Sequence, residues 1–187
     1  MVYDNKDFDY LQPLVDSFEQ IRDEALNAKH SSFQNVEDDY HQTDGEWNLY
    51  VLWQFFKKND ENCKSCPFTA NLLKDVPNLY SAAFAALAPD SHLLPHRGRN
   101  PVIRFHLGLT DNENAFFIVN NHKHYWKGGS LIGFDNTDMH EAVNKGSNRR
   151  LILAIDIKDE QMEKQQKLES WAESRKRIHS PFKNTRS

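Results

Sequence analysis

Two stretches decide the fold of this chain: PHRGRNPVIRFHLGL at residues 95–109 and WKGGSLIGFDNTDMHEAVNKGSNRRLILAIDI at residues 126–157. His96 stands at the mouth of a predicted strand, His140 lies just past another strand and its turn, and Arg150 opens the last strong strand. Histidines at the ends of different strands are suited to a metal, and a guanidinium is suited to an anion. These residues predict a metal centre beside an anion-binding arginine in a small β-barrel.

The clearest strand covers residues 102–109. Its apolar side chains alternate with Arg104 and His106, so these two polar residues fall on one face. Such a face either meets water or lines a polar pocket, and the pattern leaves both possibilities open. In the last strand, residues 151–157, the same alternation places Arg150 on the face of Ile152 and Ala154.

Short strands separated by turns are typical of a barrel or a double-sheet jelly roll. Residues 80–87 are rich in alanine and fit either a helix or a buried strand. We expect the other strands at residues 46–56, 115–120 and 130–134. We expect an amphipathic helix at about 9–29, a loop at 30–45, a short helix at 68–73 and an exposed helical tail at 159–187.

Composition and charge narrow the class of protein. The chain of 187 residues has 27 acidic and 23 basic side chains, a formal net charge of −4, which gives no support to nucleic-acid binding. The N-terminus lacks the pattern of a secretory signal, and no apolar run has the length of a transmembrane segment. We therefore expect one cytoplasmic domain, residues 1–187, with its core at 46–157.

Two further pairs of potential ligands are weaker candidates. Cys63 and Cys66 form a CxxC pair, but a second half for a zinc site is missing, so we expect two free thiols near a helix N-terminus. His122 and His124 fall on one strand face and could chelate a metal. With no third ligand nearby, a solvated face is the favoured interpretation.

Several short motifs stand in order between residues 80 and 157. They are PHRG at 95–98, RFHLGL at 104–109, Trp126 with Gly128, FD at 134–135, HEA at 140–142 with Asn144, RRLIL at 149–153 and DI at 156–157. Together they resemble the aspartyl/asparaginyl β-hydroxylase family of iron(II)- and 2-oxoglutarate-dependent oxygenases. The resemblance extends more loosely to Cys66-Pro67 and the N-terminal helix. It implies a mainly β fold, a double-stranded β-helix or jelly roll with flanking N-terminal and C-terminal helices.

The resemblance also implies residue roles. His96 and His140 look like the iron ligands, and Arg150 looks like the partner of the distal carboxylate of 2-oxoglutarate. Arg104 and His106 look like the pair near the other end of this cosubstrate and the acid group of the substrate. The implied reaction uses O₂, releases succinate and carbon dioxide, and hydroxylates a C–H bond of an amino-acid or peptidyl (Asp/Asn-like) substrate. The expected partner is a small molecule or peptide carrying a carboxylate or an amide.

Gly98, Ala85 and residues 135–136 bear on the surroundings of the iron and on the affinity for the cosubstrate. Gly98 stands where most such iron sites have a carboxylate, a gap that this family shares. A water would fill the gap, with Asp90, Asp135 or Asp138 as a candidate neighbour. Ala85 falls where the family often has a serine hydroxyl for the cosubstrate. At residues 135–136, Asp-Asn replaces the acidic pair that often follows the phenylalanine.

Two alternatives stay open. A cupin-type metal-binding isomerase or small-molecule sensor shares the jelly roll and needs no 2-oxoglutarate. However, Asp135 and Thr137 replace the proline and glycine of the second cupin motif, and the first motif is missing around His96. A non-catalytic jelly-roll binding module would keep the pocket without turnover, which agrees with Ala85.

Overall fold

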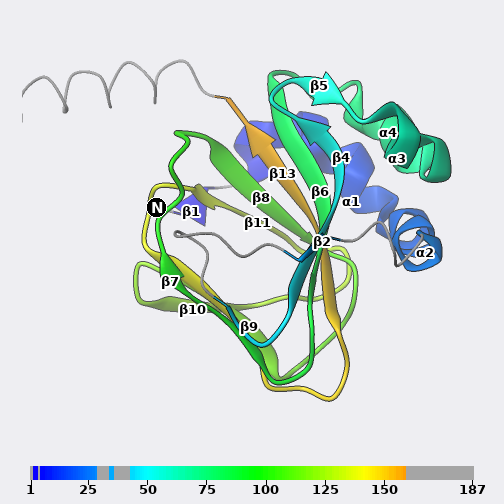
Figure 1. The fold of residues 1–187 in the computed structure, drawn as a ribbon. Coiled ribbons are helices and arrows are strands. Elements are labelled where there is room, and N and C mark those ends of the chain that lie inside the picture. Colours follow the sequence, from blue (N-terminus) through cyan, green and yellow to red (C-terminus); the bar gives the residue numbers. More distant parts are fainter. Residues whose placement is uncertain (1, 4, 29–33, 36–42, 159–187) are drawn as a thin grey trace, which may run out of the picture.

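Two antiparallel β-sheets face each other and form a double-stranded β-helix, a jelly roll (Figure 1). The computed structural model describes residues 2–3, 5–28, 34–35 and 43–158. The larger sheet has the order β1 (Val2–Tyr3), β11 (Leu131–Asp135), β8 (Ile103–Gly108), β13 (Arg150–Ile157), β6 (Leu79–Leu87), β4 (Trp47–Gln54) and β2 (Gln34–Asn35), with β5 (Lys57–Lys58) beside β4. The smaller sheet has the order β10 (His122–Tyr125), β9 (Ala115–Val119), β12 (His140–Asn144), β7 (Ser91–His96) and β3 (Thr43–Asp44).

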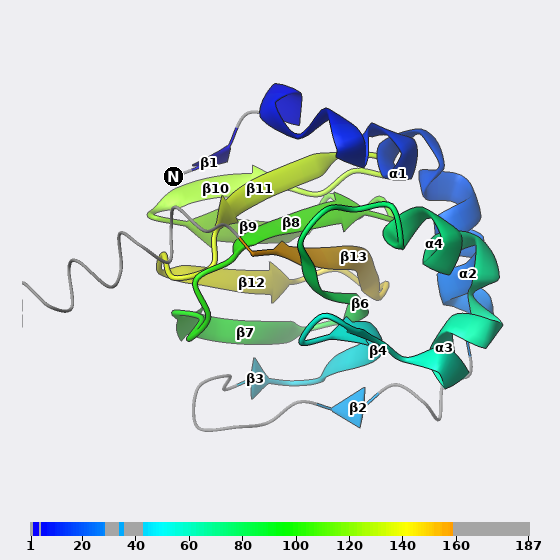
Figure 2. The ribbon, with the colours of Figure 1, turned by 90° about the horizontal axis from the view of Figure 1, so that it is seen from above.

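The helices lie together on the outer side of the larger sheet (Figure 2). They are the 3-10 helix η1 (Asn5–Leu11), α1 (Gln12–Asp16), α2 (Phe18–Asn27), α3 (Asp60–Ser65) and α4 (Pro67–Leu73). The larger sheet is therefore covered by helices on one face and by the smaller sheet on the other. No helix in the described part of the chain is long and apolar enough to cross a bilayer.

The alternation of side chains along β13 separates two hydrophobic cores. Leu151, Leu153 and Ile155 point to the helices, where they join the buried residues of α1, α2 and α4. Ile152 points between the two sheets and packs with Phe117 and other residues of the inner core. Because successive strand residues point to opposite faces, one strand serves both cores. The polar pocket is built into the inner core.

The structure confirms most of the predicted strands and resolves the ambiguous one. Residues 80–87 fall in β6, which pairs with β13 and β4 over most of its length. β6 is an interior strand, and its alanines at 82, 85 and 86 are buried in the cores on the two faces of the sheet. The strand β12 was not predicted, since its five residues look like a loop and a turn in the sequence.

The helices differ from the sequence prediction in two places, one predicted continuous helix and one helix that was not predicted. The predicted continuous helix at 9–29 is split into η1, α1 and α2, with a break at Ser17, whose φ of −108° and ψ of 15° are not helical. Its apolar face is nevertheless buried, as Leu14 and Ile21 show. The polar segment before Cys63 forms the start of α3, capped by Asn59, whose side chain accepts from the Asn62 N–H.

Some predictions lie partly or wholly outside the described residues. The expected loop at 30–45 contains the short strands β2 and β3, and its residues 30–33 and 36–42 are not described. The predicted helical tail at 159–187 lies outside the described residues.

Candidate metal and anion site

Two histidines face each other across neighbouring strands. His140 begins β12 and is paired in register with His96, the last residue of β7, and their ring centroids lie 4.2 Å apart. Each Nδ1 lies 2.7 Å from a backbone carbonyl oxygen two residues earlier, that of Leu94 or Asp138. A carbonyl only accepts, so each Nδ1 carries the proton and each Nε2 has the lone pair that a metal binds.

This pair fits a divalent transition metal such as iron(II). Neutral imidazoles are suitable ligands for such metals, and the hydrogen bond at Nδ1 holds each ring in a fixed orientation. Within the described residues, no group of three or more His, Cys, Asp and Glu side chains could hold a metal. A metal held by His96 and His140 would therefore keep open positions for small ligands.

Arg150 is a buried cation beside the histidine pair. It begins β13, is only 2% exposed, and stacks 4.3 Å from the centroid of the Trp126 ring. Its Nε and Nη1 have no hydrogen-bond partner among the described residues. Burial lowers the pKa of Arg150 to about 9, so the guanidinium is charged at neutral pH. A buried charge without a partner is costly, so this position is suited to an anionic ligand.

His106 lies in β8 on the same side. Its ring packs edge-on against Phe117 and Phe134, with centroids 5.1 Å away in both cases, and its buried Nδ1 has no hydrogen-bond partner among the described residues. Burial lowers the pKa of His106 well below its usual value, and the charges of Arg104 and Arg150 lower it further. The ring is therefore neutral and offers a hydrogen-bonding nitrogen to a ligand.

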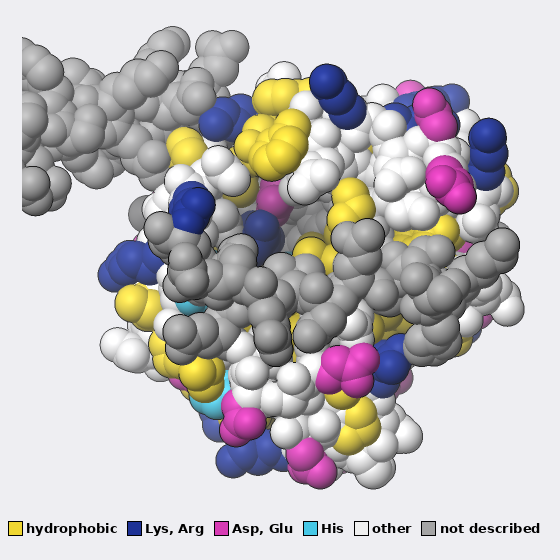
Figure 3. Space-filling view, in the orientation of Figure 1, with side chains coloured by type: hydrophobic (Ala, Val, Ile, Leu, Met, Phe, Trp, Pro, Cys, Tyr) yellow, Lys and Arg dark blue, Asp and Glu magenta, His cyan; other side chains and the backbone are white. Residues whose placement is uncertain are grey.

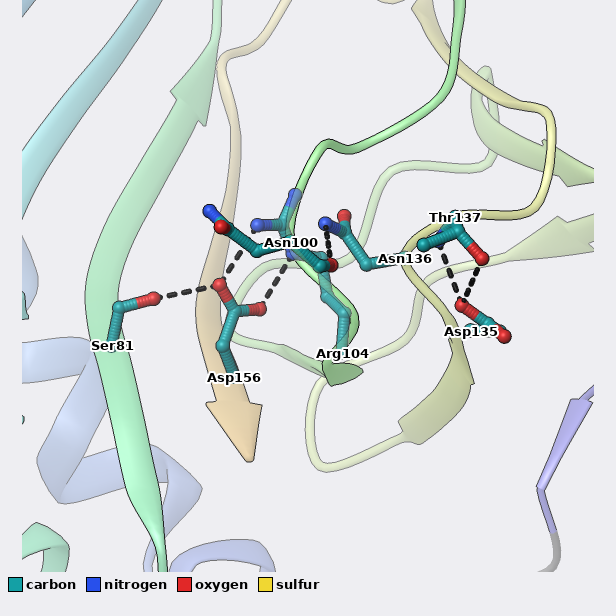
Figure 4. A network of polar contacts seen from close by, with 7 residues as sticks. All are labelled: Ser81, Asn100, Arg104, Asp135, Asn136, Thr137 and Asp156. Atoms are coloured by element: carbon teal, nitrogen blue, oxygen red, sulfur yellow. Dashed lines mark hydrogen bonds and ion pairs between the residues drawn. The ribbon is translucent and has the colours of Figure 1, made fainter. Parts of the chain in front are cut away.

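Arg104 is held by a carboxylate that sequence reasoning missed. Its Nε and Nη2 donate to the two oxygens of Asp156 at 2.7 and 2.8 Å, and Ser81 donates to the same carboxylate at 2.6 Å (Figure 4). Burial alone would lower the pKa of Arg104, but the charge and hydrogen bonds of Asp156 outweigh it and raise the pKa. The alternation through Ile152 and Ala154 extends to Asp156, so the sequence held a usable signal.

These side chains converge on one cavity of about 190 Å³. Ala85 and Ile152 form part of its apolar wall, while Ser81 and Asp156 stand at its polar end. The strand face of residues 104 and 106 thus lines a pocket instead of meeting bulk water. All five candidate site residues line this cavity: His96, Arg104, His106, His140 and Arg150.

The side chain of Asn136 occupies the space that a Cβ at residue 98 would need. The Gly98 N–H donates to the carbonyl of Asn136 at 2.7 Å, and a Cβ at residue 98 would collide with the Asn136 side chain. The Asn136 amide nitrogen in turn donates to the carbonyl of Asn100 at 3.2 Å (Figure 4). None of the suggested carboxylates lines the cavity, namely Asp90, Asp135 and Asp138.

The weaker candidate pairs lie away from this cavity. Cys63 and Cys66 are buried free thiols, and burial raises their pKa values to about 11 and about 12, which keeps them protonated and unreactive. This confirms the expected free thiols, with Cys66 at the start of α4. His122 is exposed and His124 half-buried on β10, and neither lines the cavity.

A family model described as aspartyl/asparaginyl beta-hydroxylase matches residues 15–160, which includes the whole of the cavity. The chain belongs to the aspartyl/asparaginyl β-hydroxylase family. This membership and the relatives below support a hydroxylase.

Two curated relatives of this member of the aspartyl/asparaginyl β-hydroxylase family cover most of its length. An ornithine lipid ester-linked acyl 2-hydroxylase of Rhizobium tropici is 30% identical over 97% of this chain and 68% of its own length. The aspartyl/asparaginyl beta-hydroxylase of Homo sapiens is 30% identical over 82% of this chain. The matched region is only 22% of the human protein.

A solved structure shows the same fold. A prolyl hydroxylase from Trichoplax adhaerens, in complex with a fragment of hypoxia inducible factor, superimposes with a TM-score of 0.53 at 12% identity. The superposition covers 79% of this chain and 80% of that one. At this identity the likeness establishes the jelly-roll fold alone.

Proposed function

We propose that this chain is an iron(II)- and 2-oxoglutarate-dependent dioxygenase, with His96 and His140 as the metal ligands. The observation that carries the proposal is the fully buried Arg150, whose Nε and Nη1 lack a hydrogen-bond partner among the described residues, in the same cavity as the histidine pair. A dicarboxylate supplies both things that this cavity needs: a group for the metal and a carboxylate for the guanidinium.

Bound iron(II) would supply the activation of O₂, coupled to the conversion of 2-oxoglutarate to succinate and carbon dioxide. The chain itself binds and orients the cosubstrate and excludes water. Arg150 would accommodate the distal carboxylate in its planar fork of donors, and the neutral His106 would add a hydrogen bond through Nδ1. The apolar wall around Ala85 and Ile152 keeps the cosubstrate out of bulk water and strengthens these contacts.

Arg104 is the residue that we assign to the junction of cosubstrate and substrate. Asp156 takes one hydrogen each of Nε and Nη2, so a substrate oxygen would meet Nη1 or the second hydrogen of Nη2. Because Asp156 balances the charge of Arg104, a substrate carboxylate would meet a neutralised ion pair. An amide oxygen of the substrate would accept a hydrogen bond from Arg104 as readily as a carboxylate oxygen. This supports an amino-acid or peptidyl substrate of the Asp/Asn type.

A second substrate class is an acyl chain of an amino-acid-containing lipid. The observation in its favour is the R. tropici relative, which matches 97% of this chain and is named as an acyl 2-hydroxylase. Hydroxylation of such an acyl chain would use the same metal and cosubstrate. The free thiols fit a reducing cytoplasm, where we place the reaction.

The deciding experiment incubates the chain with iron(II), 2-oxoglutarate, ascorbate and O₂ and with one candidate substrate at a time. The candidates are aspartyl and asparaginyl peptides, free amino acids and an ornithine-containing lipid. Mass spectrometry should detect a gain of one oxygen in one of them, with succinate formed in equal amount. Arg150→Ala is the inactive control.

The same experiment separates the two rival functions. A cupin-type isomerase or sensor would form no succinate in the presence of iron and O₂. A non-catalytic binding module would retain 2-oxoglutarate without converting it. Succinate released without any oxidised substrate in the panel would support the cofactor assignment and exclude the substrate classes tested.

A further inference from the structure

The turn between β4 and β5 carries two aromatic residues in an unfavourable backbone conformation. Gln54 pairs with Lys57, so Phe55 and Phe56 form a two-residue hairpin loop. Both have positive φ angles, 52° and 65°. Hairpin loops of this kind favour Asn-Gly, and bulky residues rarely adopt positive φ. Such strain at a turn points to a role for the side chains themselves.

Neither ring is used to build the core. Phe55 is 56% exposed and Phe56 is 57% exposed. Their protein contact is with the half-buried Tyr80, whose ring centroid lies 5.5 Å from that of Phe55 and 5.1 Å from that of Phe56. Figure 3 shows hydrophobic side chains gathered over the β4–β5 hairpin at the top of the molecule, with Lys and Arg side chains beside them. The two rings and Tyr80 form an exposed aromatic tip.

Basic residues surround this aromatic tip, although the whole chain is acidic. Lys57 and Lys58 follow the turn directly and are exposed. The Lys158 amine lies 5.4 Å from the centroid of the Tyr80 ring. Lys58 is partly balanced by Asp60 at 3.7 Å. Aromatic rings flanked by cations match the boundary of an anionic bilayer, where rings lie between the acyl chains and headgroups and cations lie near phosphates.

The aromatic tip also stands at the mouth of a groove that leads to the cavity. Val51, Trp53 and Phe55 line the outer part of this groove. Arg104 and Asp156 line its inner end and also line the cavity. A hollow is visible beside the hydrophobic group in Figure 3. A molecule entering from the tip would reach the cavity along one continuous surface.

We propose that the aromatic tip and its lysines dock this chain on an anionic lipid bilayer, with the groove mouth held at the bilayer surface. Two strained, exposed rings, nearby lysines and the position of the tip at the groove mouth all favour this docking. This inference goes beyond the proposed function, because docking itself requires neither iron nor 2-oxoglutarate.

The test measures flotation of the full chain with vesicles of phosphatidylcholine, with and without phosphatidylglycerol. Binding should require phosphatidylglycerol and weaken with salt. The double variant Phe55→Asn with Phe56→Gly removes both rings and installs the residues that the turn prefers. Its vesicle binding should fall at least about tenfold, which corresponds to about 1.4 kcal/mol. Its melting temperature should stay the same or rise, which a purely structural role for the rings would not allow.

Tyr125→Ser is the matched control, because Tyr125 is 51% exposed on β10 of the other sheet and its loss should leave vesicle binding unchanged. Phe55→Trp gives a second readout that keeps the aromatic tip intact. Brominated lipids should quench the added fluorescence of this tryptophan.

Three results would overturn the proposal. They are no binding of the wild-type chain to anionic vesicles, equal binding by the double variant, and no quenching of the Phe55→Trp signal. If the wild-type chain does not bind vesicles but forms a dimer that the double variant abolishes, the tip is a self-association surface instead. Vesicle binding is measured without turnover, so its failure does not bear on the dioxygenase, and a failed turnover assay does not bear on docking.

Discussion

At the scale of single residues, Arg150 and its neighbour Arg149 provide a matched pair. Arg150→Ala should leave a buried cosubstrate carboxylate without its partner, at a cost of about 2–5 kcal/mol. At about 1.4 kcal/mol per factor of ten, the affinity for 2-oxoglutarate should fall roughly thirtyfold or more. Titration of 2-oxoglutarate under anaerobic conditions with iron(II) measures this loss. Iron binding should survive, because Arg150 is not a proposed ligand.

Arg149→Ala is the control, since Arg149 precedes β13 and does not line the cavity. It should bind 2-oxoglutarate almost as the wild type does. If neither variant loses affinity, this cavity does not bind the cosubstrate.

The same arginine should limit the stability of the ligand-free chain. Burial lowers the pKa of Arg150 to about 9, below its usual value, so at neutral pH the folded state carries an unfavourable charge. Arg150→Met should therefore raise the free energy of unfolding of the ligand-free chain by about 1 kcal/mol or more, or roughly 2–4 °C in melting temperature. Calorimetry of both chains without metal or cosubstrate provides the measurement. A lower melting temperature for Arg150→Met would show that the cation is stabilised within the protein.

His106 should make the fold sensitive to acid. Burial, followed by the charges of Arg104 and Arg150, depresses its pKa in the folded state, whereas an unfolded histidine takes up a proton near pH 6.5. Below that pH the unfolded state binds more protons, so stability falls as the pH falls. His106→Gln should flatten this decline in urea unfolding between about pH 7 and pH 5. His122→Gln, on the exposed strand β10, should leave the decline unchanged.

The alternation along two strands was enough to predict that Arg104 and His106 share one face, opposite the apolar run of their strand. It also placed Arg150 on the face of Ile152. It was not enough to predict the partner of Arg104. Asp156 meets Arg104 because β13 pairs with β8 in the register that places these two residues opposite each other. Strand register depends on the whole sheet, and the alternation of residues along one strand does not reveal it.

At the scale of elements, the same limit explains the errors in the helices and in β12. The apolar positions of residues 11–25 were read correctly, because burial depends on spacing. The break at Ser17 depends on how α1 and α2 pack separately against α4, and spacing does not show that. In β12, the short segment gains its strand conformation by pairing with β9 and β7 on its two sides.

A side chain of α2 holds α4 in place. The two oxygens of Glu24 accept hydrogen bonds from the Phe68 and Thr69 backbone N–H groups at 2.8 Å, and the Thr69 hydroxyl donates at 2.7 Å. Removing such a cap should cost about 1–2 kcal/mol, because first-turn N–H groups lose their acceptor. Urea unfolding of Glu24→Ala measures this cost. Glu19→Ala, on the same helix, should change stability by less than about 0.5 kcal/mol.

At the scale of the whole molecule, the fold and the site rest on different parts of the structure. The core between the larger sheet and the helices is made of hydrophobic residues, whereas the five candidate site residues line the cavity between the two sheets. We therefore expect His96→Ala and His140→Ala each to abolish iron binding and turnover while the chain stays folded. Iron content and circular dichroism melting curves of the two variants test this together.

The control for the iron measurement is the double variant His122→Ala with His124→Ala, which removes the other histidine pair. It should retain iron. If iron is instead retained in both single variants and lost in this double variant, the metal is bound at β10.

The collision between a Cβ at Gly98 and the side chain of Asn136 has a consequence for how this site can evolve. The simplest route to a three-ligand iron site is the single change Gly98→Asp, and the packing closes that route. Residue 136 would first have to become smaller. The hydrogen bond from Asn136 to the Asn100 carbonyl would then be lost before residue 98 could supply a ligand. A library that varies positions 98 and 136 together should yield folded carboxylate-bearing variants, whereas a library of position 98 alone should not. In the proposed iron site, the packing of Asn136 against Gly98 thus keeps residue 98 from supplying a carboxylate.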